Sequence, residues 1–149
     1  MAKITLNEHF ATPPARAFAV LTDFASLPKI VSGIDKVEVL TVGPVGVGTR
    51  FRETRSLYGR MATEEMEVTA WEPPCSFTLE AHSHGAHYVI THALTPKGGG
   101  ADVELAFATK ALTPVARILS FLMQGMTKGV GELMRKDLLE AKAHAEKTA

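Results

Sequence analysis

Apolar and polar positions alternate with a period of two through the middle of the chain, from about residue 34 to residue 109. Short stretches rich in turn-forming or polar residues interrupt the alternation at residues 43–48, 58–59, 72–74, 82–86 and 97–100. Successive side chains of a strand point to opposite faces, so this pattern predicts consecutive strands joined by short turns. Strands connected in this way form an antiparallel sheet, which commonly covers one face and leaves the other in solvent.

The final third of the chain changes to the spacing of a helix. Apolar residues recur three or four positions apart from residue 113 to about residue 147, and charged residues gather toward the end. Thr113 is a suitable cap, and Pro114 suits the first turn because its missing N–H would be unpaired there. We therefore expect one long C-terminal helix.

The beginning of the chain predicts one strand followed by two short helices. The strand covers residues 3–10; the first helix starts at residues 12–14, where Thr12 can act as the cap, and the second spans residues 24–30. The later strands are expected near residues 34–41, 51–57, 61–71, 77–81, 88–94 and 103–109. A long helix needs an apolar surface to pack against, and one face of the strands supplies it. The sequence thus predicts a single α+β domain over residues 1–149, with a curved antiparallel sheet around the C-terminal helix and a pocket between them.

Composition and charge narrow the function classes. The 149 residues include 16 Lys and Arg against 16 Asp and Glu, so the formal net charge is zero and a nucleic-acid partner is not expected. No stretch approaches the roughly 18 apolar residues of a membrane span. Cys75 is the only cysteine, which excludes an intrachain disulfide, and the N-terminus lacks the apolar core of a signal peptide. These features predict a cytoplasmic protein.

Five short sequences follow one another in a fixed order along the chain. They are PARAFAVLTDF with a following Leu-Pro at residues 14–28, VEVL at 37–40, GVGTR at 46–50, VTAWEPP at 68–74 and LTP at 94–96. Together they resemble the START-like superfamily, also called the SRPBCC or polyketide cyclase/dehydrase group. The resemblance implies the helix-grip fold, a curved antiparallel sheet that grips a long C-terminal helix over an internal cavity. Because this group includes lipid carriers, hormone binders, cyclases, dioxygenase domains and chaperone activators, the resemblance implies a pocket rather than one reaction.

The inward positions of the strands and of the helix are the candidate ligand-binding residues. If Phe51 and Leu57 point inward, a period of two brings Glu53 and Arg55 to the same face. On the next strand, Glu64 would share a face with Met66, Val68 and Ala70. The apolar candidates are Phe51, Leu57, Val68, Phe77, Leu79, Ile90, Leu105, Phe107, Leu122, Met123 and Met126, and the polar candidates are Glu53, Arg55, Glu64, Tyr88 and His92.

Apolar walls with a few polar groups are typical of ligand pockets. We therefore expect the protein to bind a hydrophobic or amphipathic small molecule, such as a lipid, a polyketide or an aromatic compound. The polar set would orient a carbonyl, hydroxyl or carboxylate of this ligand, and the alternative is that these positions lie at a wet rim.

Two other function classes stay open. An enzyme resembling the aromatic cyclases and dehydratases would use the same cavity, with His92 or Arg55 handling proton transfer or enolate charge. A protein-interaction module would use the apolar start of the last helix to bind a partner or a second copy. The small residues Gly125 and Gly129 would let the sheet, a ligand or a second subunit of a homodimer approach the helix closely. The interaction hypothesis predicts a large exposed apolar patch and a filled interior without a pocket.

Three histidines occur within six residues, at His82, His84 and His87. Because His82 and His84 would share a strand face, a zinc site is conceivable. The sequence offers no obvious fourth ligand beside them, so we expect a solvated hairpin and neither a metal nor a cofactor.

Overall fold

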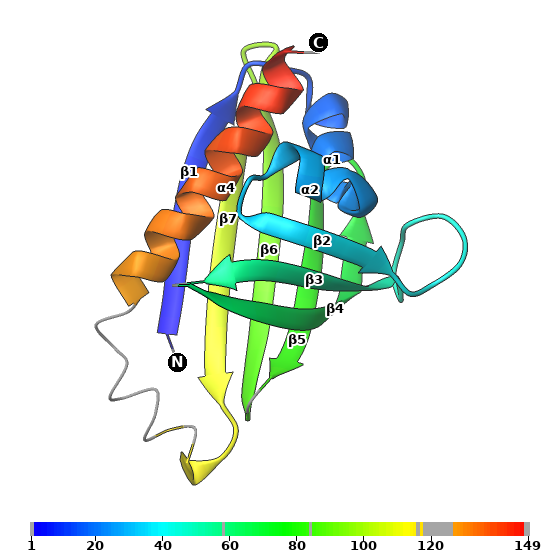
Figure 1. The fold of residues 1–149 in the computed structure, drawn as a ribbon. Coiled ribbons are helices and arrows are strands. Elements are labelled where there is room, and N and C mark those ends of the chain that lie inside the picture. The colour runs from blue at the N-terminus through cyan, green and yellow to red at the C-terminus, as the bar shows by residue number, and fades with distance from the viewer. Residues whose placement is uncertain (1, 58, 84, 116, 118–126, 148–149) are drawn as a thin grey trace.

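Seven strands form one antiparallel sheet in the part of the chain that the computed structural model describes, residues 2–57, 59–83, 85–115, 117 and 127–147 (Figure 1). The sheet order is β1-β7-β6-β5-β4-β3-β2. The strands are β1 (Ala2–Phe10), β2 (Ile34–Val39), β3 (Arg50–Leu57), β4 (Arg60–Glu72), β5 (Ser76–Ser83), β6 (Ala86–Lys97) and β7 (Gly100–Ala111). Each predicted region of alternation coincides with one of these strands, and the predicted fold class is confirmed.

Two short helical regions follow β1, as predicted. Helix α1 (Pro14–Thr22) comes first, and a 3-10 turn, η1 (Phe24–Ser26), leads into α2 (Leu27–Ile30). The predicted cap at Thr12 is wrong, because Pro13 takes the cap position and no side chain caps α1. The carbonyl of Pro13 accepts hydrogen bonds from the amides of Arg16 and Ala17 (both 3.0 Å), so the helix begins one residue later.

The long C-terminal helix is present as α4 (Thr127–Lys147). Upstream of it, the amide of Arg117 donates to the carbonyl of Thr113 (3.0 Å), which agrees with a helical start at this point. The middle of the predicted helix, residues 118–126, lies outside the described residues.

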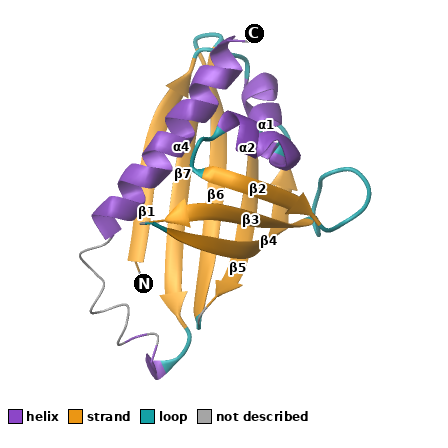
Figure 2. Ribbon diagram, viewed as in Figure 1, coloured by secondary structure: helices purple, strands orange, loops and turns teal. Residues whose placement is uncertain are grey.

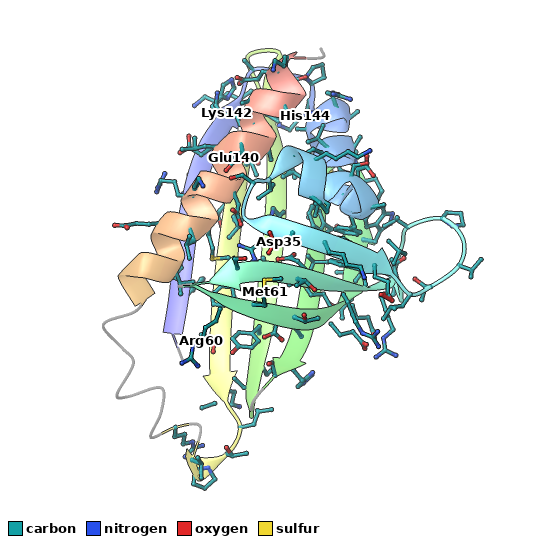
Figure 3. All side chains as sticks on the ribbon, in the orientation of Figure 1. Asp35, Arg60, Met61, Glu140, Lys142 and His144 are labelled. Atoms are coloured by element: carbon teal, nitrogen blue, oxygen red, sulfur yellow. The ribbon has the colours of Figure 1, made fainter. Side chains whose placement is uncertain are left out.

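The sheet is strongly curved, and α4 lies against its concave side (Figure 2). Strands β2, β3 and β4 run across the direction of β5, β6 and β7, so that they close over one side of the molecule (Figure 1). Polar contacts hold α4 in place: Arg135 donates to Glu8 of β1 (2.8 Å), and the amide and hydroxyl of Ser32 both donate to Glu140 (2.8 Å each; Glu140 is labelled in Figure 3). The helix is thereby joined to the first strand and to the segment after α2.

An aromatic cluster forms the core between α1, η1 and the sheet. The Phe24 and Phe51 rings stack with centroids 4.3 Å apart, and the Phe18 ring meets Trp71 (5.0 Å) and Phe77 (5.5 Å) edge-on. Phe51 and Phe77 are 0% and 1% exposed. Burial of these rings anchors the N-terminal helices on one end of the concave face, and the space that remains is a cavity.

A bulge in β4 changes which residues point inward near the end of that strand. Val68 pairs with Leu79 but Ala70 pairs with Thr78, so the register shifts between them. Since the bulge inserts one extra residue, the alternation inverts beyond it. Val68 is fully buried, whereas Ala70 is exposed and Trp71 packs on Phe18 instead. The prediction that Ala70 shares a face with Val68 is wrong for this reason.

Candidate functional site

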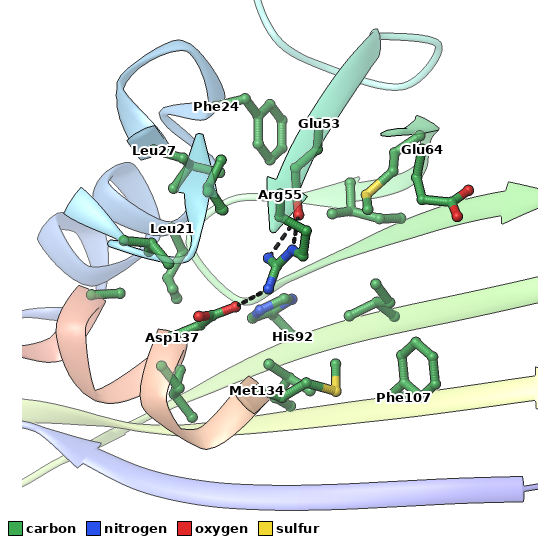
Figure 4. A pocket seen from close by; sticks show the side chains of 18 of the residues that line it. Leu21, Phe24, Leu27, Glu53, Arg55, Glu64, His92, Phe107, Met134 and Asp137 are labelled. Carbon is green, nitrogen blue, oxygen red and sulfur yellow. Dashed lines mark hydrogen bonds and ion pairs between the residues drawn. The ribbon is translucent and has the colours of Figure 1, made fainter. Parts of the chain in front are cut away.

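A cavity of about 270 Å³ lies between the concave face of the sheet and α4 (Figure 4). Its walls are mainly apolar and come from the N-terminal helical region, from several strands and from α4. The lining residues are Leu21, Phe24, Leu27, Val31, Ile34, Phe51, Glu53, Arg55, Ala62, Glu64, Met66, Phe77, Leu79, Ile90, His92, Leu105, Phe107, Val130, Leu133, Met134, Asp137, Leu138 and Ala141.

Most of the candidate ligand-binding residues lie in this lining. The structure brings together Phe51, Glu53, Arg55, Glu64, Phe77, Leu79, Ile90, His92, Leu105 and Phe107. Val68 and Tyr88 do not line the cavity: Val68 is fully buried in the core, and the Tyr88 ring packs beside Phe107, with centroids 5.8 Å apart. The side chain of Leu57 and the helix residues Leu122, Met123 and Met126 lie outside the described residues.

Asp137 is the main site residue that the sequence patterns did not identify. Its neighbours Arg135, Lys136 and Glu140 suggest the polar face of the helix. Its position in the helix indicates the opposite. Residue 137 follows the apolar lining residues at 130, 133 and 134 by seven, four and three positions, so it lies on the same face of the helix as they do. Residues of the N-terminal helical region, such as Leu21, Phe24 and Leu27, also line the cavity, and they were not among the candidate residues predicted from the sequence.

Arg55 lies at the centre of a buried polar cluster that joins the sheet to α4 (Figure 4). Its Nε donates to Glu53 Oε1 (2.8 Å), and its Nη2 lies 2.7 Å from the same oxygen. Its Nη1 donates to Asp137 Oδ2 (2.9 Å). The side chains of Glu53, Arg55 and Asp137 are 10%, 20% and 21% exposed, so water screens this cluster weakly.

Burial is the largest single influence on the pKa values of Arg55 and Asp137, but it does not decide both outcomes. It lowers the pKa of Arg55, but attraction to Glu53 and Asp137 outweighs that effect, and the pKa ends above its ordinary value. The pKa of Asp137 is raised, first because burial disfavours the carboxylate and further because Glu53 and Glu140 repel it, although Arg55 opposes the shift. Arg55 therefore keeps its charge, and Asp137 takes up a proton more readily than an ordinary aspartate.

His92 faces the cavity as a neutral imidazole. Its ring stacks on Phe77, the residue opposite it on β5, with centroids 4.4 Å apart and planes 8° apart. Burial lowers the pKa of His92 to about 4. Its Nδ1 is buried and has no hydrogen-bond partner among the described residues. A cavity-lining imidazole of this kind can exchange a hydrogen bond with a bound molecule.

The acid sensitivity of the fold provides a test of this state of His92. The unfolded chain binds a proton at this residue below its ordinary pKa of 6.5, whereas the native protein does so only near 4, so stability is lost as the pH falls through that window. We expect this loss to be about 1.4 kcal/mol per pH unit. Urea unfolding of the native protein and of His92→Gln at several pH values across that window checks it. The variant should lose less stability toward the acid end, and parallel losses would contradict a buried neutral histidine.

Glu64 lies further along the cavity, on the strand next to Glu53. The two residues are direct cross-strand neighbours, and Ser83 Oγ donates to Glu64 Oε1 (3.0 Å). The pKa of Tyr88 is raised by burial first and by the charge of Glu64 second. Glu64 thus adds a second site of negative charge along the cavity.

The predicted hairpin joins β5 to β6, and its histidines make contacts that the sequence did not predict. The rings of His82 and His87 stack with centroids 4.4 Å apart, and His87 Nε2 lies 2.7 Å from Glu80 Oε1. The pKa of Glu80 is lowered by a hydrogen bond from Thr69 and then by His87. His84 lies outside the described residues. Within the described part of the chain, no group of three His, Cys, Asp or Glu residues has a geometry that could hold a metal ion.

A curved antiparallel sheet, a C-terminal helix held against it and an apolar cavity between them define a protein of the helix-grip class. The family model for "Polyketide cyclase / dehydrase and lipid transport" matches residues 1–146. The chain therefore belongs to this family, within the START-like group. A comparison with curated proteins found no match. In the helices that the structure describes, no segment is long and apolar enough to cross a membrane.

Solved structures with the same fold come from diverse sources. The di-domain ARO/CYC StfQ from the steffimycin biosynthetic pathway gives a TM-score of 0.81 at 14% identity over 98% of this chain and 51% of StfQ, so this chain spans about half of that protein. TTHA0849 from Thermus thermophilus gives 0.72 at 20% identity over 96% of this chain and 99% of that chain. Major latex-like protein 151 from Panax ginseng gives 0.73 at 14% identity over 97% of both chains. Identities this low show the fold alone.

Proposed function

We propose that this protein binds a hydrophobic or amphipathic small molecule, such as a lipid, a polyketide or an aromatic compound, in the cavity between its sheet and α4. The observation that carries the proposal is the combination of an apolar lining with one buried polar cluster, Glu53–Arg55–Asp137, and the cavity-facing His92. Burial of about 200 Å² of apolar ligand surface contributes roughly 5 kcal/mol before the costs of association. The polar groups would set the orientation of the ligand.

Filling the cavity tests this proposal. Ile90 lines the cavity from β6, whereas its neighbour Val89 points to the opposite face of the strand. We expect N-phenyl-1-naphthylamine, an uncharged fluorophore, to bind the native protein saturably. The variant Ile90→Trp should weaken this binding by at least about tenfold, while Val89→Trp should change it little. Equal binding to both variants, or none to the native protein, would contradict a ligand site in the cavity. Mass spectrometry of organic extracts from the purified protein would then identify a co-purifying ligand.

A cyclase or dehydratase activity in the same cavity is the second candidate. It is supported by His92, which lines the cavity as a neutral imidazole whose buried Nδ1 has no hydrogen-bond partner among the described residues, and by the neighbouring guanidinium of Arg55 (Figure 4). The protein also shares its fold with StfQ, a di-domain ARO/CYC protein of the steffimycin biosynthetic pathway. In a catalyst, His92→Gln should abolish turnover and retain binding. A carrier should show no turnover in either form.

The protein-interaction hypothesis receives less support. It predicted a filled interior, and the described residues instead surround a cavity. A homodimer that packs through Gly125 and Gly129 stays a prediction from the sequence, because position 125 lies outside the described residues. Ligand binding is the function that the geometry supports best.

A further inference from the structure

The charges that face the cavity are unequal in sign. Among the described lining residues, three carboxylates, Glu53, Glu64 and Asp137, stand against the single guanidinium of Arg55. His92 adds no positive charge near neutral pH. The cavity therefore carries an excess of negative charge, and this excess persists if Asp137 is protonated, because two carboxylates still face one guanidinium.

The guanidinium of Arg55, which is the one positive charge among these lining residues, is already paired with two carboxylates. Arg55 gives its Nε and Nη2 to Glu53 Oε1 and its Nη1 to Asp137 Oδ2. An anionic ligand group would have to displace one of these carboxylates from a weakly screened site, and the displaced carboxylate would lose its partner. By contrast, Arg55 uses one oxygen of each carboxylate, so the second oxygen of Glu53 or Asp137 can accept a hydrogen bond from a ligand.

We propose that the cavity selects amphiphiles whose polar end is a neutral or positively charged hydrogen-bond donor, such as an alcohol, a phenol or an amine, and discriminates against carboxylates and phosphates. This inference rests on the proposed ligand-binding function and specifies its substrate class. It narrows the sequence-based expectation, in which the polar set could orient a carbonyl, a hydroxyl or a carboxylate of the ligand.

A series of ligands with one chain and different head groups tests this selectivity. Decanol, decylamine and decanoate share a ten-carbon chain, and each is used to displace bound N-phenyl-1-naphthylamine from the intact protein near neutral pH. We expect decanoate to bind at least about tenfold more weakly than decanol and decylamine. Decanoate binding as tightly as decanol, or displacement by none of the three, would overturn the proposal. Failure of the fluorophore itself to bind would instead refute the proposed function, so the two failures are distinguishable.

Variants that remove one negative charge identify its source. Glu64→Gln is the first choice because the described partner of Glu64 is the neutral hydroxyl of Ser83. Asp137→Asn is the second choice because Asp137 forms an ion pair with Arg55, which the substitution weakens. Glu64→Gln and Asp137→Asn should both narrow the preference for decanol over decanoate several-fold. Glu104→Gln makes the same change of net charge at an exposed position of β7 outside the cavity, and it should leave the preference unchanged. Circular dichroism confirms that each variant is folded. An unchanged preference in both cavity variants would overturn the electrostatic explanation.

Discussion

Replacing Arg55 with methionine is expected to lower the free energy of unfolding by about 3–5 kcal/mol near neutral pH. Methionine keeps the apolar stem but leaves Glu53 and Asp137 buried without a counter-charge. Their side chains are 10% and 21% exposed, so water compensates little for the lost partner. Urea-induced unfolding of the two proteins, followed by circular dichroism, measures the difference.

Arg52 provides a matched control on the same strand. Its side chain is 50% exposed, and it lies 3.8 Å from Glu38 and 3.7 Å from Glu65, both on the solvent side. Exposed ion pairs of this kind contribute about 0–1 kcal/mol, so Arg52→Met should change stability little. Equal losses in the two variants would mean that the Arg55 cluster is not a buried charge network.

Acid should relieve the defect of Arg55→Met. Without Arg55, burial raises the pKa of Asp137 without opposition, so the native variant binds protons that its unfolded chain does not. Stability therefore returns as the pH falls through that raised pKa. Adding Asp137→Asn to Arg55→Met should restore part of the stability at neutral pH by the same argument. A loss that is independent of pH would indicate that packing, and not charge, is the cause.

The network does not need to stabilise the fold in order to matter. Buried ion pairs can often be replaced by apolar residues of similar volume without loss of stability, because desolvation offsets their attraction. A purely structural solution for this part of the chain would be an apolar contact between β3 and α4. The presence of three ionisable groups at the wall of a cavity therefore supports the proposal that they orient a polar group of the ligand.

The architecture was predictable because it follows from local periodicity. Alternating residues separated by Gly and Pro turns predict the strands, and the inward face that begins at Phe51 includes Glu53 and Arg55 as expected. The predicted inward positions described on β3 (Phe51, Glu53 and Arg55), β5 (Phe77 and Leu79) and β7 (Leu105 and Phe107) all line the cavity, and the alternation runs without interruption on these strands. Position along a regular strand is enough to assign a face there.

The parts that failed depend on tertiary structure. The bulge in β4 exchanges Ala70 for Trp71 on the inner face, and no local sequence feature specifies which residue is doubled. Asp137 looks like a member of a solvated helix face until the curvature of the sheet brings Arg55 within 2.9 Å of it. The sequence did contain one indication, since Asp137 occurs at the helical spacing of the apolar lining residues. Charged residues are usually exposed, however, so its charge favoured a position in solvent.

Replacing Phe77 with alanine is expected to lower the free energy of unfolding by about 3–5 kcal/mol. Its ring is 1% exposed and contacts Phe18, Phe24, Trp71 and His92, with centroids 4.4–6.4 Å apart. Removal of a ring at this central position leaves a void that its neighbours cannot fill, because each of them is held by other contacts. Thermal and urea unfolding measure the loss.

Phe107→Ala separates stability from ligand binding. Phe107 also lines the cavity, but it is only half-buried, so its loss should lower stability by about 1–2 kcal/mol while weakening ligand binding through the lost apolar contact.

Phe77→Ala should in addition admit water to His92 and raise the pKa of His92 toward its ordinary value, because burial is what lowers that pKa. The acid sensitivity expected of the native protein would then diminish in this variant. If Phe77→Ala and Phe107→Ala had equal effects on stability, the aromatic cluster would not be the structural core against which the cavity is built.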